Sequence, residues 1–189
     1  AHQPQALVVT ARCVLTGATL AQEIVRHDGS ERACARRIVD RLAGMGPMLV
    51  VMDRGFPARD LIAQLLRRRI DFVVRMCGGK CAWRELHGHD VGPGHDRMVD
   101  LRLRGADGRW QTCRLRTILT QRPRRGRPRC NRTPEQARLL TNLTGSYWST
   151  QRIVALYHRR WDIETSFRED KRLLGATRSR ATTRNGFTN

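Results

Sequence analysis

The sequence predicts an α/β core together with a small antiparallel β insertion. A short, continuous apolar run over residues 47–52 is followed by a helical pattern from about Pro57 and then by a second strand over 70–75. A strand, a helix and a strand within so few residues imply a parallel, right-handed crossover. Farther along, alternating residues over 98–103 and 110–119 indicate antiparallel strands.

The first part of the chain is predicted to be a β-hairpin followed by a helix. Residues 6–15 are rich in apolar and β-branched types, and 18–25 can return as the second strand. Ser30 is suited to the N-cap of a helix over about 31–43. The residues that this helix is predicted to turn toward the core are Cys34, Ile38 and Leu42.

The apolar run 47–52 has the character of a strand that is buried on both faces, because it lacks polar alternation. It stops at Asp53. A carboxylate at the carboxyl end of a parallel strand faces the crevice in which α/β proteins bind ligands. The alternative for Asp53 is structural, as a cap of the next helix or a partner of Arg54. That helix is predicted to bury Leu61, Ile62, Leu65 and Leu66.

Four parts are predicted along the chain. Residues 1–76 form the N-terminal part of the core, 77–120 a small antiparallel β insertion, 121–138 a basic loop, and 139–189 the last strand and helix of the core. The basic loop holds six arginines and no acidic residue over 121–134. Such a composition is typical of a segment that contacts nucleic acid, or of a solvated linker.

The whole chain is strongly basic, with 36 lysines and arginines against 17 acidic residues and a formal charge of +19. An excess of this size favours a polyanionic partner, most often nucleic acid. A G+C-rich genome would explain arginine over lysine but not basic over acidic residues. No run of about 18 apolar residues occurs, so the sequence predicts no membrane-spanning helix.

The six cysteines are scattered, as in a reduced intracellular protein. Paired Cys-x-x-Cys motifs, which mark many zinc sites, do not occur. A zinc-stabilised module is nevertheless one alternative. Its candidate ligands are Cys77, Cys81, His87, His89 and His95.

A stripe of polar residues lies on the helix predicted to begin at Ser149 or Thr150. With about 100° between successive residues, its four members fall within an arc of about 60°. They are Tyr157, Arg160, Glu164 and Lys171. The apolar seam beside them consists of Leu156, Ile163, Phe167 and Leu174. The stripe therefore places a phenol, two cations and a carboxylate at the edge of the core. The alternative is an ordinary i,i+4 ion pair between Arg160 and Glu164.

The spacing Tyr157-x2-Arg160-x3-Glu164-x6-Lys171 resembles the Y-R-E-K signature of DDE transposases of the insertion-sequence-four family. The flanking segment 157–168 is similar to that family as well. Residues 51–56 resemble the segment that carries the family's second catalytic aspartate, and 140–143 resemble the strand before its final catalytic helix. Two motifs in the right order, over about residues 5–180, make a specific match.

The resemblance implies an RNase H-like core, which is a mixed sheet flanked by helices. Its carboxylates bind Mg²⁺ or Mn²⁺, ions that prefer oxygen ligands. It implies that Asp53 and Glu164 are catalytic and metal-binding residues, and that Tyr157, Arg160 and Lys171 bind DNA near the cut. The implied activity is DNA cleavage and strand transfer at transposon ends, in the bacterial cytoplasm near the nucleoid. The implied partners are transposon-end DNA and, for an intact relative, a second copy of the protein.

The first catalytic aspartate of that family is expected upstream of the hairpin at 6–25, and no residue before Asp53 occupies a matching motif. Asp28 and Asp40 are the only earlier aspartates, and they are predicted beside and inside a helix. We therefore expect a fragment of a catalytic domain, without its first strand and truncated after its last helix. Such a fragment would bind metal poorly and would not cleave DNA. The alternative is a non-catalytic basic remnant or regulator that binds DNA.

Overall fold

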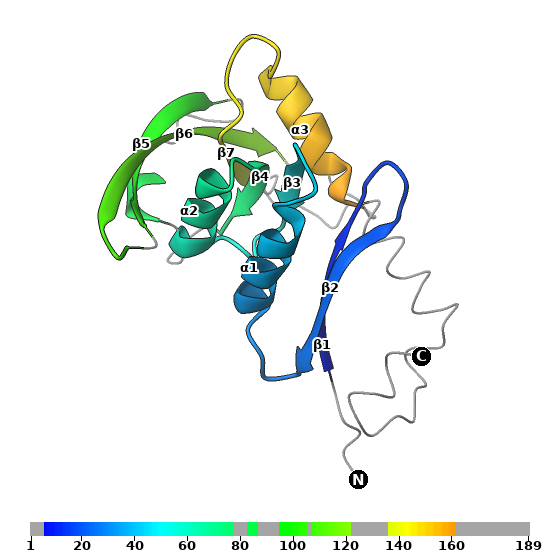
Figure 1. Cartoon of the computed structure of the whole chain (residues 1–189). Helices are drawn as coiled ribbons and strands as arrows, with labels where there is room; N and C mark the ends of the chain where they lie inside the picture. The colour runs from blue at the N-terminus through cyan, green and yellow to red at the C-terminus, as the bar shows by residue number, and fades with distance from the viewer. Residues whose placement is uncertain (1–5, 78–82, 87–94, 106, 122–135, 162–189) are drawn as a thin grey trace, which may run out of the picture. The chain divides into compact units, whose positions relative to one another are not determined.

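The computed structural model describes residues 6–77, 83–86, 95–105, 107–121 and 136–161 (Figure 1). These residues form a two-stranded antiparallel sheet, a five-stranded mixed sheet and three α-helices. This mixed α/β architecture confirms the predicted fold class and is consistent with an RNase H-like fold. None of the described helices is long and apolar enough to cross a membrane.

The chain divides into two compact units, one made of residues 1–46 and 158–189 and the other of residues 47–157. The first unit contains the predicted hairpin, in which β1 (Ala6–Arg12) pairs with β2 (Thr19–Arg26). A backbone hydrogen bond of 2.8 Å from Cys13 N–H to Ala18 C=O closes the turn. β1 therefore ends three residues earlier than the sequence predicts.

Helix α1 (Glu31–Leu42) follows the hairpin and packs against both of its strands. The Oγ atom of Ser30 accepts a hydrogen bond of 3.3 Å from the Ala33 N–H, which confirms Ser30 as the N-cap. Cys34, Ile38 and Leu42 are buried as predicted, and Ala35 and Val39 are buried beside them.

The second unit is built on the five-stranded sheet, whose strand order is β3-β4-β7-β6-β5. β3 and β4 are parallel, and every other neighbouring pair is antiparallel. The strands are β3 (Leu49–Met52), β4 (Asp71–Met76), β5 (Asp96–Arg104), β6 (Trp110–Gln121) and β7 (Gln136–Thr141). β7 begins inside the range predicted to be a basic loop, and residues 122–135 of that loop lie outside the described residues.

Helix α2 (Arg59–Arg67) is the crossover between the two parallel strands, and it begins two residues after Pro57. It packs against β4 and β5. Its side chains at Leu61, Ile62 and Leu65 are completely buried, as predicted, whereas Leu66 is only half-buried. On β5 the buried residues alternate with exposed ones and are Val99, Leu101 and Leu103.

β3 differs from its prediction. Leu49, Val50 and Val51 are only half-buried, and among the described strands β3 has one neighbour, β4. The prediction of a strand buried on both faces is therefore wrong. In addition, β3 is an edge strand of the described sheet. An apolar run reflects what the two faces of a strand contact, and it carries no information about how many strands pair with its edges.

Candidate active site

Helix α3 (Thr150–His158) covers the sheet over β4, β7 and β6 (Figure 1). Two of its side chains, Ile153 and Tyr157, enter a buried cluster. The sheet and the loop before the helix supply the other members, which are Val73, Ile118, Leu139 and Leu143. Ile118 alternates along β6 with the residues that pair with the buried side of β5, so α3 lies on the face opposite α2.

Within α3 the most buried side chains are not those of the predicted seam. Leu156 is only half-buried against the cluster, whereas Ile153 and Tyr157 are the buried pair, one helical turn apart. Tyr157 is 6% exposed and is thus a core residue, not a residue at the edge of the core. The remaining seam residues lie outside the described residues, at Ile163, Phe167 and Leu174.

Asp53 is the residue that follows β3, at the carboxyl end of the parallel pair. Its side chain is half-buried. The phenol of Tyr157 donates a hydrogen bond of 3.2 Å to Oδ1 of Asp53. The structure therefore brings together two residues that the sequence placed in separate motifs, and it does so at the end of the sheet where ligands bind in α/β proteins.

Asp53 does not cap α2. The N-cap of that helix is Ala58, which has no side-chain capping hydrogen bond. The acidic residue in the first turn is Asp60, whose Oδ1 accepts a hydrogen bond of 2.9 Å from the Leu61 N–H. The backbone carbonyl of Asp53 instead accepts a hydrogen bond of 3.2 Å from Phe56 N–H in the turn after β3. The structure therefore excludes the alternative in which the Asp53 carboxylate caps α2.

The other members of the polar stripe are described only in part. Arg160 is 9% exposed, and its guanidinium carbon lies 5.2 Å from the centre of the Trp161 ring. Glu164 and Lys171 lie outside the described residues. Of the five predicted site residues, the structure thus joins Asp53 and Tyr157.

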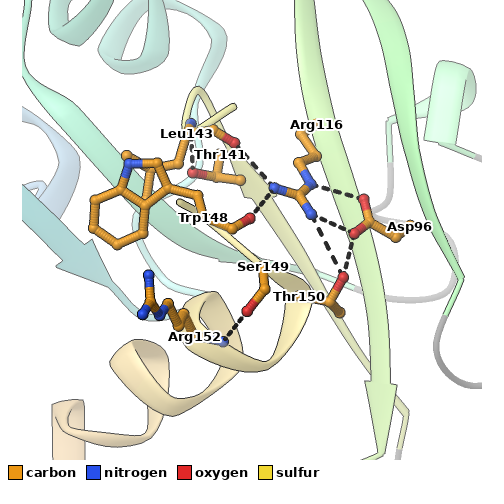
Figure 2. A network of polar contacts seen from close by, with 8 residues as sticks. All are labelled: Asp96, Arg116, Thr141, Leu143, Trp148, Ser149, Thr150 and Arg152. Carbon is orange, nitrogen blue, oxygen red and sulfur yellow. Dashed lines mark hydrogen bonds and ion pairs between the residues drawn. The ribbon is translucent and has the colours of Figure 1, made fainter. Parts of the chain in front are cut away.

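A polar network fixes the start of α3 (Figure 2). The Arg116 guanidinium on β6 donates to both carboxylate oxygens of Asp96 on β5, at 2.8 and 2.5 Å. It also donates to the main-chain oxygen of Trp148, at 2.5 Å. The Thr150 hydroxyl donates to the same Asp96 carboxylate. The Thr150 hydroxyl is therefore engaged with Asp96, and Ser149 is the N-cap. The Oγ atom of Ser149 accepts a hydrogen bond of 3.3 Å from the Arg152 N–H.

The network is electrostatically favourable. Its hydrogen bonds to Arg116 hold the pKa of Asp96 below the ordinary value, although burial opposes this shift. The same hydrogen bond raises the pKa of Arg116. Both groups are therefore charged near neutral pH, with side-chain exposures of only 14% for Arg116 and 23% for Asp96. An ion pair this enclosed orients the first turn of α3, and with it the turn that carries Tyr157.

A second set of hydrogen bonds joins β7 to β4 beneath α3. The Asn142 amide oxygen accepts from the Phe72 N–H at 2.9 Å, and its amide nitrogen donates to Asp71 at 3.0 Å. The Thr141 hydroxyl donates to the Phe72 carbonyl at 2.5 Å. The sequence predicts only a strand for this segment. The signal for the additional hydrogen bonds is a Thr-Asn pair at the end of a strand, where short polar side chains bind neighbouring backbone.

The described residues do not by themselves form a metal centre. Within the described part of the chain, no group of three or more His, Cys, Asp or Glu side chains gathers in one place. Asp53 offers one carboxylate, whereas Mg²⁺ requires several oxygen ligands. For the zinc alternative, the Cys77 thiol donates to the Arg54 carbonyl at 3.0 Å, and Cys81, His87 and His89 lie outside the described residues.

The family described as the transposase DDE domain matches residues 7–189. No curated protein matches the chain in sequence.

Proposed function

The chain belongs to the transposase DDE domain family, and from this premise we propose that its active site cleaves and joins DNA at transposon ends. The family supports a transposase function, a DNA substrate and a divalent metal ion. The observation that carries the proposal for this site is the hydrogen bond of 3.2 Å between Tyr157 and Asp53, because it joins the two segments that resemble catalytic motifs.

Asp53 and Glu164 are proposed as the catalytic carboxylates that hold the ion. Asp53 has the position that such a ligand needs, half-buried after a parallel strand with one oxygen already oriented by Tyr157. Glu164 follows Tyr157 by seven residues, as in the signature that the sequence resembles, and this spacing supports the assignment. Bound Mg²⁺ or Mn²⁺ supplies charge stabilisation to the phosphoryl oxygens during displacement.

Tyr157, Arg160 and Lys171 are proposed to hold the DNA backbone beside those carboxylates. The spacing of the four stripe residues supports a place within the insertion-sequence-four branch of the family. Tyr157 has a second task that its burial supports, because its phenol also positions Asp53. A guanidinium binds phosphate through two parallel hydrogen bonds, and an ammonium does so as a point charge, so Arg160 and Lys171 suit this role.

A second candidate function is that of a basic protein that binds DNA without cleaving it. Two aspartates precede Asp53 in the sequence, Asp28 and Asp40, and neither follows a strand of the five-stranded sheet. Asp28 lies in the turn after β2, and Asp40 lies within α1. The net charge of +19 favours the second candidate function, a non-catalytic DNA-binding remnant or regulator, for this same chain.

The metal site is tested by adding Mn²⁺ to isotopically labelled chain and recording paramagnetic broadening of the amide resonances. We expect broadening around Asp53 and around Glu164 that disappears in the Asp53→Asn and Glu164→Gln variants. The matched control is Asp100→Asn, which removes an exposed carboxylate from β5. Broadening that survives both site variants would show that these carboxylates do not bind the ion.

Cleavage is tested separately, with supercoiled plasmid and Mg²⁺. Nicking that depends on both Mg²⁺ and Asp53 would support the transposase function and Asp53 as a catalytic residue. DNA binding without nicking above the level of a buffer control would instead support the second candidate, a non-catalytic DNA-binding remnant or regulator.

A further inference from the structure

One face of the β5–β6 hairpin is open to solvent on the side of the sheet where α3 lies. Side chains alternate along β6, so Trp110, Thr112 and Arg114 leave the sheet on the same side as Ile118 beneath α3. Their partners across the ladder leave on that side as well. Ile118 is completely buried, whereas Trp110, Thr112 and Arg114 are exposed. The helix therefore covers one end of this face and leaves the other end uncovered.

The uncovered part is basic and aromatic. We name it the hairpin face, and it consists of Asp100, Arg102, Arg104, Trp110, Thr112 and Arg114. Trp110 is 55% exposed, which is unusual for so large an apolar ring. The guanidinium carbon of Arg102 lies 5.6 Å from the centre of that ring. Among the described residues, no ion pair or hydrogen bond engages the Arg114 side chain, although Asp100 lies opposite it.

A second arginine–aromatic pair stands at the start of α3. The Arg152 guanidinium carbon lies 4.4 Å from the centre of the Tyr147 ring, and Arg152 also donates to the Tyr147 carbonyl at 2.8 Å. Tyr147 is 65% exposed. The Arg116 network joins this end of α3 to β5 and β6 (Figure 2), and Arg114 lies two residues from Arg116 on the same side of the sheet. The pair thus stands at the start of the helix that covers the same side of the sheet to which the hairpin face belongs.

We propose that the hairpin face and the Tyr147–Arg152 pair bind the sugar–phosphate backbone of duplex DNA outside the catalytic site. This inference rests on the proposed function for the identity of the substrate. Stacking on an aromatic ring holds a planar guanidinium in place, so less freedom is lost when it binds phosphate. From Trp110 to Arg116 the strand extends about 20 Å, a length over which duplex DNA carries roughly 12 phosphates.

The experiment measures the affinity of the full chain for a duplex of random sequence, about three helical turns long, at several salt concentrations. The test variant is Arg102→Gln with Arg114→Gln. The slope of log K against log salt is negative, and each lost phosphate contact makes it shallower by about 0.9. We therefore expect the slope of the variant to be shallower by nearly two. A slope equal to that of the wild-type chain would overturn the proposal.

The matched control is Arg67→Gln with Arg84→Gln, which removes the same charge from the opposite side of the sheet. Both arginines are exposed, in α2 and in the short 3₁₀ helix η2 (Arg84–Leu86), which packs against β5. We expect the control to keep the wild-type slope. If the test and control variants make the slope shallower by the same amount, only net charge matters and the hairpin face is not a binding surface. Circular dichroism of each variant confirms folding.

Trp110→Ala separates stacking from charge. Loss of an exposed cation–π contact should weaken binding about two- to fivefold while leaving the salt slope unchanged. Unchanged affinity would contradict the role of the ring.

The Arg102→Gln, Arg114→Gln variant distinguishes this inference from the proposed function. It should keep the Mn²⁺ broadening around Asp53 and Glu164 while its salt dependence weakens. Unchanged salt dependence in this variant would count against the hairpin face alone, whereas broadening that persists in Asp53→Asn and in Glu164→Gln would count against the metal site alone.

Discussion

The phenol of Tyr157 donates a hydrogen bond of 3.2 Å to a carboxylate oxygen of Asp53, across 104 residues of chain. Its ring lies in the core while its hydroxyl reaches the end of the edge strand β3. One side chain therefore serves both packing and the candidate active site. Any change in the seating of α3 against the sheet will also change the surroundings of Asp53.

The two tasks of Tyr157 are separated by two substitutions. Tyr157→Phe keeps the ring and removes the donor, so we expect the free energy of unfolding to fall by about 1 kcal/mol. Tyr157→Ala also leaves a cavity and should cost about 3–5 kcal/mol. Urea denaturation of both variants measures this. In an Asp53→Asn background, the Phe substitution should cost less, and an equal cost in both backgrounds would mean that the hydrogen bond contributes nothing to stability.

The ion pair between Asp96 and Arg116 should be sensitive to the loss of either partner. Arg116→Met leaves the Asp96 carboxylate enclosed with the Thr150 hydroxyl but without its charged partner. We expect a cost of about 2–3 kcal/mol, below the range for fully buried pairs because both groups are partly exposed. Arg114→Met is the control, because Arg114 lies two residues away on the same strand and is exposed. We expect the control to change stability by less than about 0.5 kcal/mol. Similar losses in the two variants would refute the special role of Arg116.

The same pair makes stability depend on acid. Because the pKa of Asp96 is lowered in the folded chain, its contribution is fully present above the ordinary aspartate pKa, about 4, and is lost as the pH falls through the folded-state value. The wild-type chain and Asp96→Asn should therefore differ most near neutral pH and converge on acidification. Unfolding free energies measured from pH 7 down to about 3 provide the check, and parallel curves would contradict it.

Local sequence patterns predicted the elements but not the connections between them. Ser30 marked the start of α1, and the spacing of Leu61, Ile62 and Leu65 marked the buried face of α2, because capping and periodicity act within one helix. The meeting of Asp53 with Tyr157 depends on how α3 is seated on the sheet. That seating depends on Arg116, whose partners lie on another strand and in a loop. No local sequence pattern can therefore predict these contacts.

Asn142 is a residue whose role appears only in the folded chain. Asn142→Ala removes the acceptor of the Phe72 N–H and the donor to Asp71 together. We expect a loss of about 1–3 kcal/mol, since a backbone N–H in the sheet is left without a partner. Thr144→Ala, two residues on and exposed, should have almost no effect. Hydrogen exchange adds a local test, because the Phe72 amide should exchange faster in Asn142→Ala and not in the control.

The turn that leads into α3 requires a glycine for its backbone rather than for space. Gly145 has φ +89°, and a Cβ atom added there would meet nothing within 4 Å. Gly145→Ala should therefore cost about 1–2 kcal/mol from left-handed backbone strain alone. Gly44 is a matched control, because its surroundings are equally open and its φ is not positive. Gly44→Ala should be neutral or stabilising by up to about 1 kcal/mol. Thermal or urea unfolding measures both variants. A Gly145→Ala variant as stable as the wild-type chain would contradict the role of the positive φ at Gly145.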